Sequence, residues 1–156
     1  MKKALLLGAL ICAIGMLAAC KSGTANEAAV NTIDTDELTW AYIDEKLSSG
    51  AFPAEAECMF ILSDTTLDEG HSEGVGNNLF NLLRGNQEAN ELFSSSLKGI
   101  TSEERGKSLS SLMSLMSIDI ALAEYGQYED FLIDFPLFRG CAEAEDEFNL
   151  IKENGI

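Results

Sequence analysis

The chain has 156 residues, of which 46% are hydrophobic, and it carries 10 Lys and Arg against 26 Asp and Glu. This length and apolar content predict one folded domain and exclude a largely disordered chain. The net charge of −16 argues against nucleic-acid binding, because clustered Lys and Arg are needed to hold a phosphate backbone. With one His and four Cys the chain offers few zinc ligands, so we expect no metal and no other cofactor.

The first segment is charged and then apolar. Lys2 and Lys3 precede an uninterrupted run of apolar or small residues from Ala4 to Ala19. This order is typical of the charged and hydrophobic regions of a signal peptide. The run is shorter than the about 20 residues that a membrane-spanning helix needs.

The run closes on Leu17, Ala18, Ala19 and Cys20, and this stretch resembles the bacterial lipoprotein signal peptide. The resemblance implies that Leu17, Ala18 and Ala19 form the recognition sequence and that cleavage occurs before Cys20. It also implies that the Cys20 sulfur receives diacylglycerol and that the new amino group is acylated, so the membrane is the first expected partner. In Gram-negative lipoproteins an Asp after this Cys favours inner-membrane retention. Lys21 therefore favours the outer membrane, facing the periplasm. An ordinary secretory signal is the alternative.

Three segments follow from this interpretation. Residues 1–19 are the signal peptide, residues 20–33 a lipidated polar tether, and residues 34–156 a single helical domain. Removal of the signal peptide takes away two Lys and no acid, so the net charge of the mature chain is −18.

We expect the domain to open with two helices separated by Gly50. Thr35 starts the first one, with acids in its first turn, although a strand is the alternative because apolar residues also alternate from Leu38 to Tyr42. Pro53 occupies a plausible first position of the second helix. The predicted apolar stripe of this second helix is Phe52, Ala56, Met59, Phe60 and Leu67.

The next segments have clear start and stop signals. A helix with an apolar stripe ends near Gly85, and Asn86 then caps a second helix that stops at Gly99. Thr101 and Glu104 have the spacing of a capping box and open the longest predicted helix, which reaches Tyr125. Its wide apolar face, which includes Ile118 and Leu122, predicts a central position in the domain. The apolar positions of the helix before Gly85 are Val75, Leu79, Leu82 and Leu83, and those of the helix capped by Asn86 are Ala89, Leu92, Phe93 and Leu97.

A short stretch from Tyr128 to Phe135 precedes Pro136, and a last helix carries Cys141, Ala144 and Phe148 on one face. The fold class predicted is therefore all-α, a compact bundle of about five to seven helices. Two cysteines remain in the mature domain, and an oxidising compartment favours a disulfide between Cys58 and Cys141 that would staple the bundle. Two buried free thiols are the alternative.

The sequence holds no constellation that indicates catalysis. His71 lies among Asp, Glu and Gly, which we interpret as a solvated loop before a helix capped by Ser72, with a metal site as the alternative. Adjacent acids on a helix point to different faces, so they do not form an acid and base pair. These pairs are Glu103 and Glu104, Glu129 and Asp130, and Glu145 to Glu147. We therefore expect no enzymatic activity.

Charge is the remaining signal for function. Nine acids stand against Arg139 and Lys152 from Glu124 to the end of the chain. An acidic surface steers a basic protein partner, so we expect a non-catalytic binding module in the cell envelope. Small exported helical immunity proteins that block a cell-wall-degrading toxin are similar in outline. A structural or envelope-assembly lipoprotein is the alternative.

Overall fold

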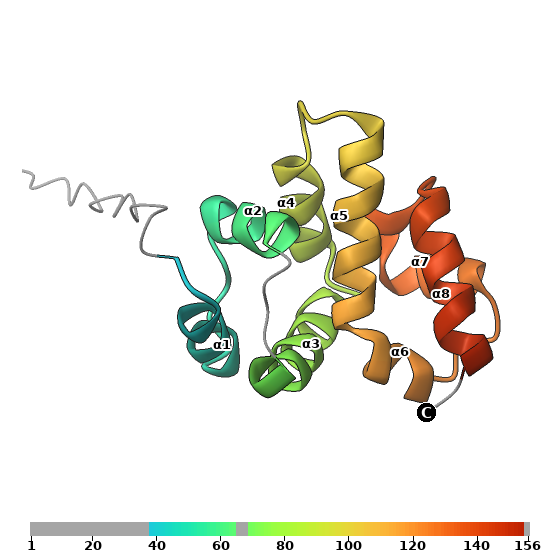
Figure 1. Cartoon of the computed structure of the whole chain (residues 1–156), viewed down its shortest axis with the longest axis horizontal. Coiled ribbons are helices and arrows are strands. Elements are labelled where there is room, and N and C mark those ends of the chain that lie inside the picture. The colour runs from blue at the N-terminus through green and yellow to red at the C-terminus, as the bar shows by residue number, and fades with distance from the viewer. Residues whose placement is uncertain (1–37, 65–68, 155–156) are drawn as a thin grey trace, which may run out of the picture. The chain divides into compact units, whose positions relative to one another are not determined.

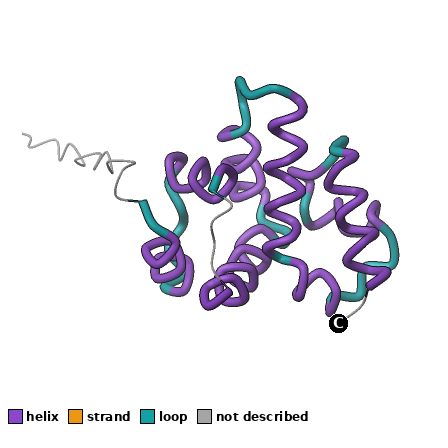
Figure 2. The backbone as a smooth tube through the Cα atoms, in the orientation of Figure 1, coloured by secondary structure: helices purple, strands orange, loops and turns teal. Residues whose placement is uncertain are grey.

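The structure, a computed structural model, describes residues 38–64 and 69–154, and every regular element in these ranges is a helix (Figures 1 and 2). The all-α prediction is confirmed for this part of the chain. The described elements, eight α-helices and one short 3-10 helix, exceed the five to seven helices expected. They are α1 Trp40–Ser48, α2 Glu55–Ser63, α3 Glu69–Leu83, α4 Gln87–Ser96, α5 Ser102–Leu115, α6 Ser117–Leu122, α7 Tyr128–Asp134, η2 Pro136–Phe138 and α8 Ala142–Asn154.

The described residues all belong to one compact unit, Thr32–Ile156. Within them, no helix is both long and apolar enough to cross a membrane. The predicted lipid-attachment sequence, Leu17 to Cys20, lies outside the described residues, as does Leu67.

Side-chain caps mark the starts of α4 and α5. The Asn86 side chain accepts a hydrogen bond from the Ala89 amide at 3.2 Å, which confirms the predicted cap of α4. Thr101 and Glu104 form the predicted capping box: the Glu104 amide donates to Thr101 Oγ1 and the Thr101 amide to Glu104 Oε2. Gly85 and Gly99 have φ of +64° and +91°, the left-handed conformation that commonly follows a helix end.

The first two helices differ from expectation. The first one starts at Trp40 and is capped by Thr39, so both the start at Thr35 and the strand alternative are wrong. Pro53 precedes the second helix rather than opening it. The buried face of α2 is also rotated from the predicted stripe, since Met59 is 53% exposed. The buried residues of α2 are Glu57, Cys58, Ile61 and Leu62. Hydrophobic patterning treats a Glu as a surface residue and thereby selects the wrong face.

The longest predicted helix is interrupted at Met116. There the last turn of α5 tightens, since the Met116 amide donates to the Met113 carbonyl oxygen at 3.0 Å. Helix α3 crosses the chain at this point so closely that a Cβ added to Gly76 would overlap the Leu115 carbonyl oxygen. Beyond the break the chain enters α6, which packs on α3 and α8. Ile118 and Leu122, expected in the core, are therefore 40% and 73% exposed.

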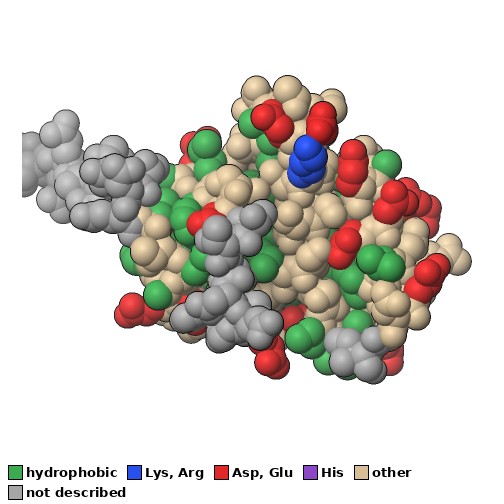
Figure 3. Space-filling view, in the orientation of Figure 1, with side chains coloured by type: hydrophobic (Ala, Val, Ile, Leu, Met, Phe, Trp, Pro, Cys, Tyr) green, Lys and Arg blue, Asp and Glu red, His purple; other side chains and the backbone are tan. Residues whose placement is uncertain are grey.

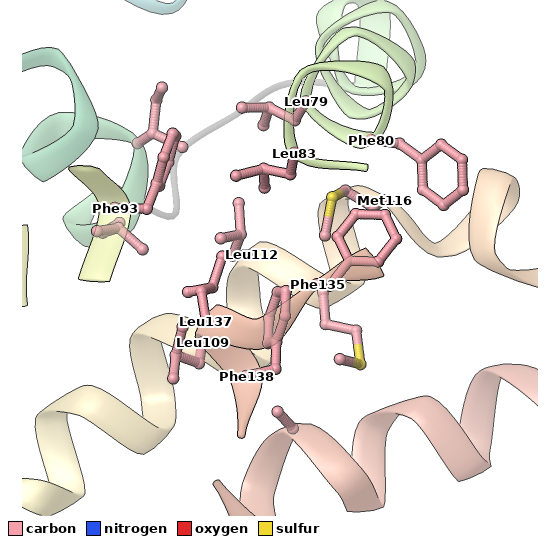
Figure 4. Packing of buried hydrophobic residues seen from close by; sticks show 14 of the residues in the cluster. Leu79, Phe80, Leu83, Phe93, Leu109, Leu112, Met116, Phe135, Leu137 and Phe138 are labelled. Atoms are coloured by element: carbon pink, nitrogen blue, oxygen red, sulfur yellow. The ribbon is translucent and has the colours of Figure 1, made fainter. Parts of the chain in front are cut away.

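The core lies where α3, α4 and α5 meet the aromatic side chains of α7, η2 and α8 (Figure 4). Phe135 stacks on Phe131 with ring centroids 4.4 Å apart, and Phe131 also contacts Phe138 and Phe148. Leu79 and Leu83 reach this cluster from α3 as predicted. The predicted apolar positions Val75, Ala89, Phe93, Leu97, Ala144 and Phe148 are buried as well. The other buried residues of this region include Leu109, Leu112, Met113, Met116, Ile120 and Leu137.

The structure does not support the predicted disulfide. Cys58 and Cys141 are both buried and both free. Cys58 is buried on α2, which packs against α4 and α5. Cys141 lies directly before α8, and its Sγ is 3.5 Å from Glu143 Oε2. The compartment favours oxidation, but a disulfide also requires the two Cα atoms to lie within about 7 Å of each other.

Replacing Gly76 with Ala is expected to lower the free energy of unfolding by about 2 kcal/mol, because the new methyl group meets rigid backbone at Leu115. Gly74 is the matched control on the same helix, since its Cβ would lie 3.5 Å from Asp44 Oδ1, an ordinary contact. Gly74→Ala should stabilise the protein by up to about 1 kcal/mol through helix propensity. Urea unfolding compares the two. Equal stability of the two variants would show that the close crossing does not exist.

Candidate functional site

Among the described residues, the acids and cysteines considered from the sequence are not brought together into one site. The His71 side chain lies outside the described residues, but the backbone there belongs to α3, which begins at Glu69. The expectation of a solvated loop at His71, before a helix capped by Ser72, is therefore wrong. Among the described residues, no group of three or more His, Cys, Asp or Glu is placed to hold a metal ion.

The two thiols are poorly suited to nucleophilic chemistry. Burial, together with the nearby carboxylates of Glu57 and Glu55, raises the pKa of the Cys58 thiol to about 12. Burial also raises the pKa of Cys141, with a further contribution from Glu143. The thiolate is the reactive form, so both side chains are inert packing residues at neutral pH.

The buried Glu57 carboxylate is the centre of a partly buried ionic cluster that joins α1 to α2. Its carboxylate accepts hydrogen bonds from Tyr42 Oη at 2.7 Å, Lys46 Nζ at 2.6 Å and the Ala54 amide at 2.6 Å. Burial by itself would raise the pKa of Glu57, but these three donors outweigh it and hold the pKa below its usual value. The hydrogen bond to Glu57 raises the pKa of Tyr42. Every partner is internal to the fold, so the cluster has a structural role.

A second polar cluster joins α3 to α7. Asp134 accepts a hydrogen bond from Tyr125 Oη at 2.6 Å, and Arg84 Nε lies 3.4 Å from the same carboxylate oxygen. Burial and this contact raise the pKa of Tyr125 to about 12. Asp134 also borders a cleft of about 480 Å³ whose inner wall includes Asn90. The Asn90 amide binds the carbonyls of Leu83 and Asn86, so its donors are already used within the fold.

The paired acids have separate roles. Glu103 pairs with Lys107 and Glu104 completes the capping box, so this pair supports the start of α5. Glu129 and Asp130 lie exposed in the first turn of α7. Acidic side chains also gather over and around α8, with apolar side chains between them (Figure 3).

A groove of about 300 Å³ separates α6 from α8. It is lined by Ser117, Ile118, Ala121, Glu147, Leu150, Ile151 and Asn154. Ile118 is 40% exposed and Leu150 is 51% exposed, so both walls present apolar surface to solvent. The groove exists because the break at Met116 brings α6 beside α8 (Figure 1).

Two hydrogen bonds organise the charges at this groove. Ser114 Oγ on α5 donates to Glu147 Oε1 at 2.7 Å, which fixes one acid at the groove wall. Lys152, the only cation of α8, turns to the end of α6 and donates to the Ala123 carbonyl at 2.9 Å. The acids of α8 are Glu143, Glu145, Asp146, Glu147 and Glu153. The groove therefore combines apolar walls with a negatively charged surface, and we take it as the candidate functional site.

Sequence reasoning missed this groove and the Glu57 cluster. Ile118 and Leu122 were assigned to the core because their spacing continues the α5 stripe, and no sequence signal marks the break at Met116. The residue at the capping position before Glu57 is Ala54, so the Ser or Thr of a capping box is absent.

Comparison with known proteins does not supply a function. No protein-family model matches this chain, and no curated protein or solved structure matches it either. The features of this chain that bear on function are the groove, the charge distribution and the N-terminal sequence.

Lys46→Met is expected to lower the free energy of unfolding by about 3 kcal/mol at pH 7, because it leaves the buried Glu57 carboxylate without its cation. In the wild type, the lowered pKa of Glu57 gives a stabilisation that is present above the usual Glu pKa and is lost as the pH falls through the lowered value. In the variant, burial dominates and raises the Glu57 pKa. The difference in free energy of unfolding between the wild type and Lys46→Met should therefore shrink as the pH falls from 7 to about 4.3.

Urea unfolding over this pH range measures the effect. Lys107→Met is the control, since Lys107 and Glu103 form an exposed pair, and it should change stability little at any pH. If the loss of unfolding free energy caused by Lys46→Met grows as the pH falls, Glu57 is not a buried carboxylate held by Lys46.

Proposed function

We propose that this protein is a membrane-anchored bacterial lipoprotein whose helical domain is a non-catalytic binding module for a basic protein in the cell envelope. The observation that carries the binding role is the α6–α8 groove, with apolar walls and an acidic surface. An immunity-type inhibitor of a toxin is one form of this function.

The N-terminal sequence supports the anchor. The order of Lys2 and Lys3, the apolar run and the Leu17-Ala18-Ala19-Cys20 sequence resembles a lipoprotein signal peptide. Each buried CH₂ of an acyl chain contributes about 0.8 kcal/mol, so two or three chains on Cys20 hold a protein stably on a bilayer. Lys21 supports an outer-membrane location with the domain facing the periplasm.

The charge distribution supports a basic partner. The mature chain has a net charge of −18, and α8 carries five of its acids against one lysine, whose amine is engaged with α6. Such a surface accelerates the approach of a positively charged protein and opposes that of an acidic one. The nucleic-acid phosphate backbone would be repelled by the same field.

Cys20→Ala is expected to move the protein from the membrane fraction to the soluble fraction, because the acyl chains lose their attachment atom. Cell fractionation followed by intact-mass measurement detects both the relocation and the loss of the lipid mass. Cys58→Ala serves as the control and should leave the location unchanged. Membrane retention of Cys20→Ala at an unaltered mass would refute the anchor.

Capture from an envelope extract tests the binding role. The immobilised mature chain should retain one basic protein at about 0.1 M salt and lose it at about 1 M, because screening weakens charge attraction. A stoichiometric envelope complex that resists high salt would instead indicate the structural or envelope-assembly role.

A further inference from the structure

We infer that the α6–α8 groove binds one amphipathic helix of the partner, with apolar residues facing the groove and basic residues along its flank. This inference rests on the proposed function and specifies how the partner is recognised. It follows from the spacing of the groove residues, their exposure and the position of the neighbouring acids.

The wall formed by α8 has helical periodicity. Glu147, Leu150, Ile151 and Asn154 line the groove at spacings of three, four and seven residues, which places them on one face of the helix. This face rises by about 10 Å, or two helical turns. Ser117, Ile118 and Ala121 form the facing wall on α6. Two neighbouring helices with such faces leave a furrow into which a third helix packs by its side-chain ridges.

The exposure of the groove walls indicates that no element of the described chain fills the groove between α6 and α8. Leu150 and Ile118 are half-exposed, while Ile151 is partly buried against the core. A partner helix with apolar residues three, four and seven positions apart would cover Leu150 and Ile118 together. Covering exposed apolar surface is the main source of free energy for such docking.

The acidic side chains beside the groove favour a basic helix as its ligand. Asp146 and Glu153 lie four residues before and three residues after Leu150, so both neighbour it on the outer surface of α8. Both are exposed, and Glu147 is held at the groove wall by Ser114. Lys or Arg on the flank of the docked helix would lie against these carboxylates. A second copy of this chain would bring α8 acids against α8 acids, and an anionic bilayer would meet the same repulsion.

The test uses the mature chain from residue 20 with Cys20→Ala, so that no lipid competes for the probe. The probe is a fluorescent amphipathic peptide of Leu and Lys about 15 residues long, and its control has the same composition in scrambled order. Fluorescence anisotropy measures binding. The amphipathic peptide should bind at least about tenfold more tightly than the scrambled one, because only its apolar residues align along one face.

Variants locate the binding site. Leu150→Ser should weaken binding about tenfold through the loss of buried apolar contact. Ile133→Ser is the matched control, since Ile133 is 76% exposed on α7 and does not line this groove, and it should leave affinity unchanged. The double variant Asp146→Asn, Glu153→Gln should weaken binding and reduce its salt dependence. Glu129→Gln, Asp130→Asn removes the same charge from α7 and should have a smaller effect.

Equal affinity of the two peptides, or equal affinity of Leu150→Ser and the wild type, would overturn the inference. Self-association or vesicle binding that Leu150→Ser abolishes would also overturn it, because the groove would then have another occupant. The proposed function is judged separately. If Leu150→Ser still captures the basic envelope protein in a salt-sensitive manner, only the groove inference fails, whereas absence of any capture by the wild type refutes the function itself.

Discussion

The close crossing of α3 over the junction between α5 and α6 is the constraint on which the described fold depends. Only a glycine at position 76 leaves room for the Leu115 carbonyl oxygen, and the chain turns at the buried Met116 directly after this contact. A continuous helix from Thr101 to Tyr125 would carry Ile118 and Leu122 along the α5 stripe. Instead α6 packs on both α3 and α8, and the groove between α6 and α8 results from that turn.

Short-range signals predicted much of the helical architecture. The Asn86 cap, the capping box of Thr101 and Glu104, and the glycine after α4 depend on neighbours within a few residues, so the sequence displays them directly. The turn at Met116 depends on a contact with Gly76, forty positions earlier in the chain. The face of α2 depends on Glu57 meeting Lys46 across two helices. Such long-range contacts leave no local pattern, and the groove was therefore not predictable from periodicity.

The polar groups of the domain divide into two kinds. In the clusters around Glu57 and Asp134, each carboxylate accepts hydrogen bonds from side chains of the fold and connects neighbouring helices. Four of the five acids of α8 are exposed, Glu147 is partly buried, and the one lysine of that helix is turned toward α6. The charges of the two clusters are paired across helices, whereas the exposed α8 acids Asp146 and Glu153 face solvent, where a basic partner would meet them. This division, together with the exposed apolar groove walls, is the basis for assigning a binding role.

A binding footprint decides whether the turn at Met116 creates a docking groove for a basic amphipathic helix. The measurement is the change in amide NMR shifts of the ¹⁵N-labelled mature chain, carrying Cys20→Ala, as the amphipathic Leu and Lys peptide is added. We expect the largest changes on α6 and on the α8 face that holds Glu147, Leu150 and Asn154. Changes concentrated elsewhere, or spread evenly over the acidic surface, would contradict docking at this groove.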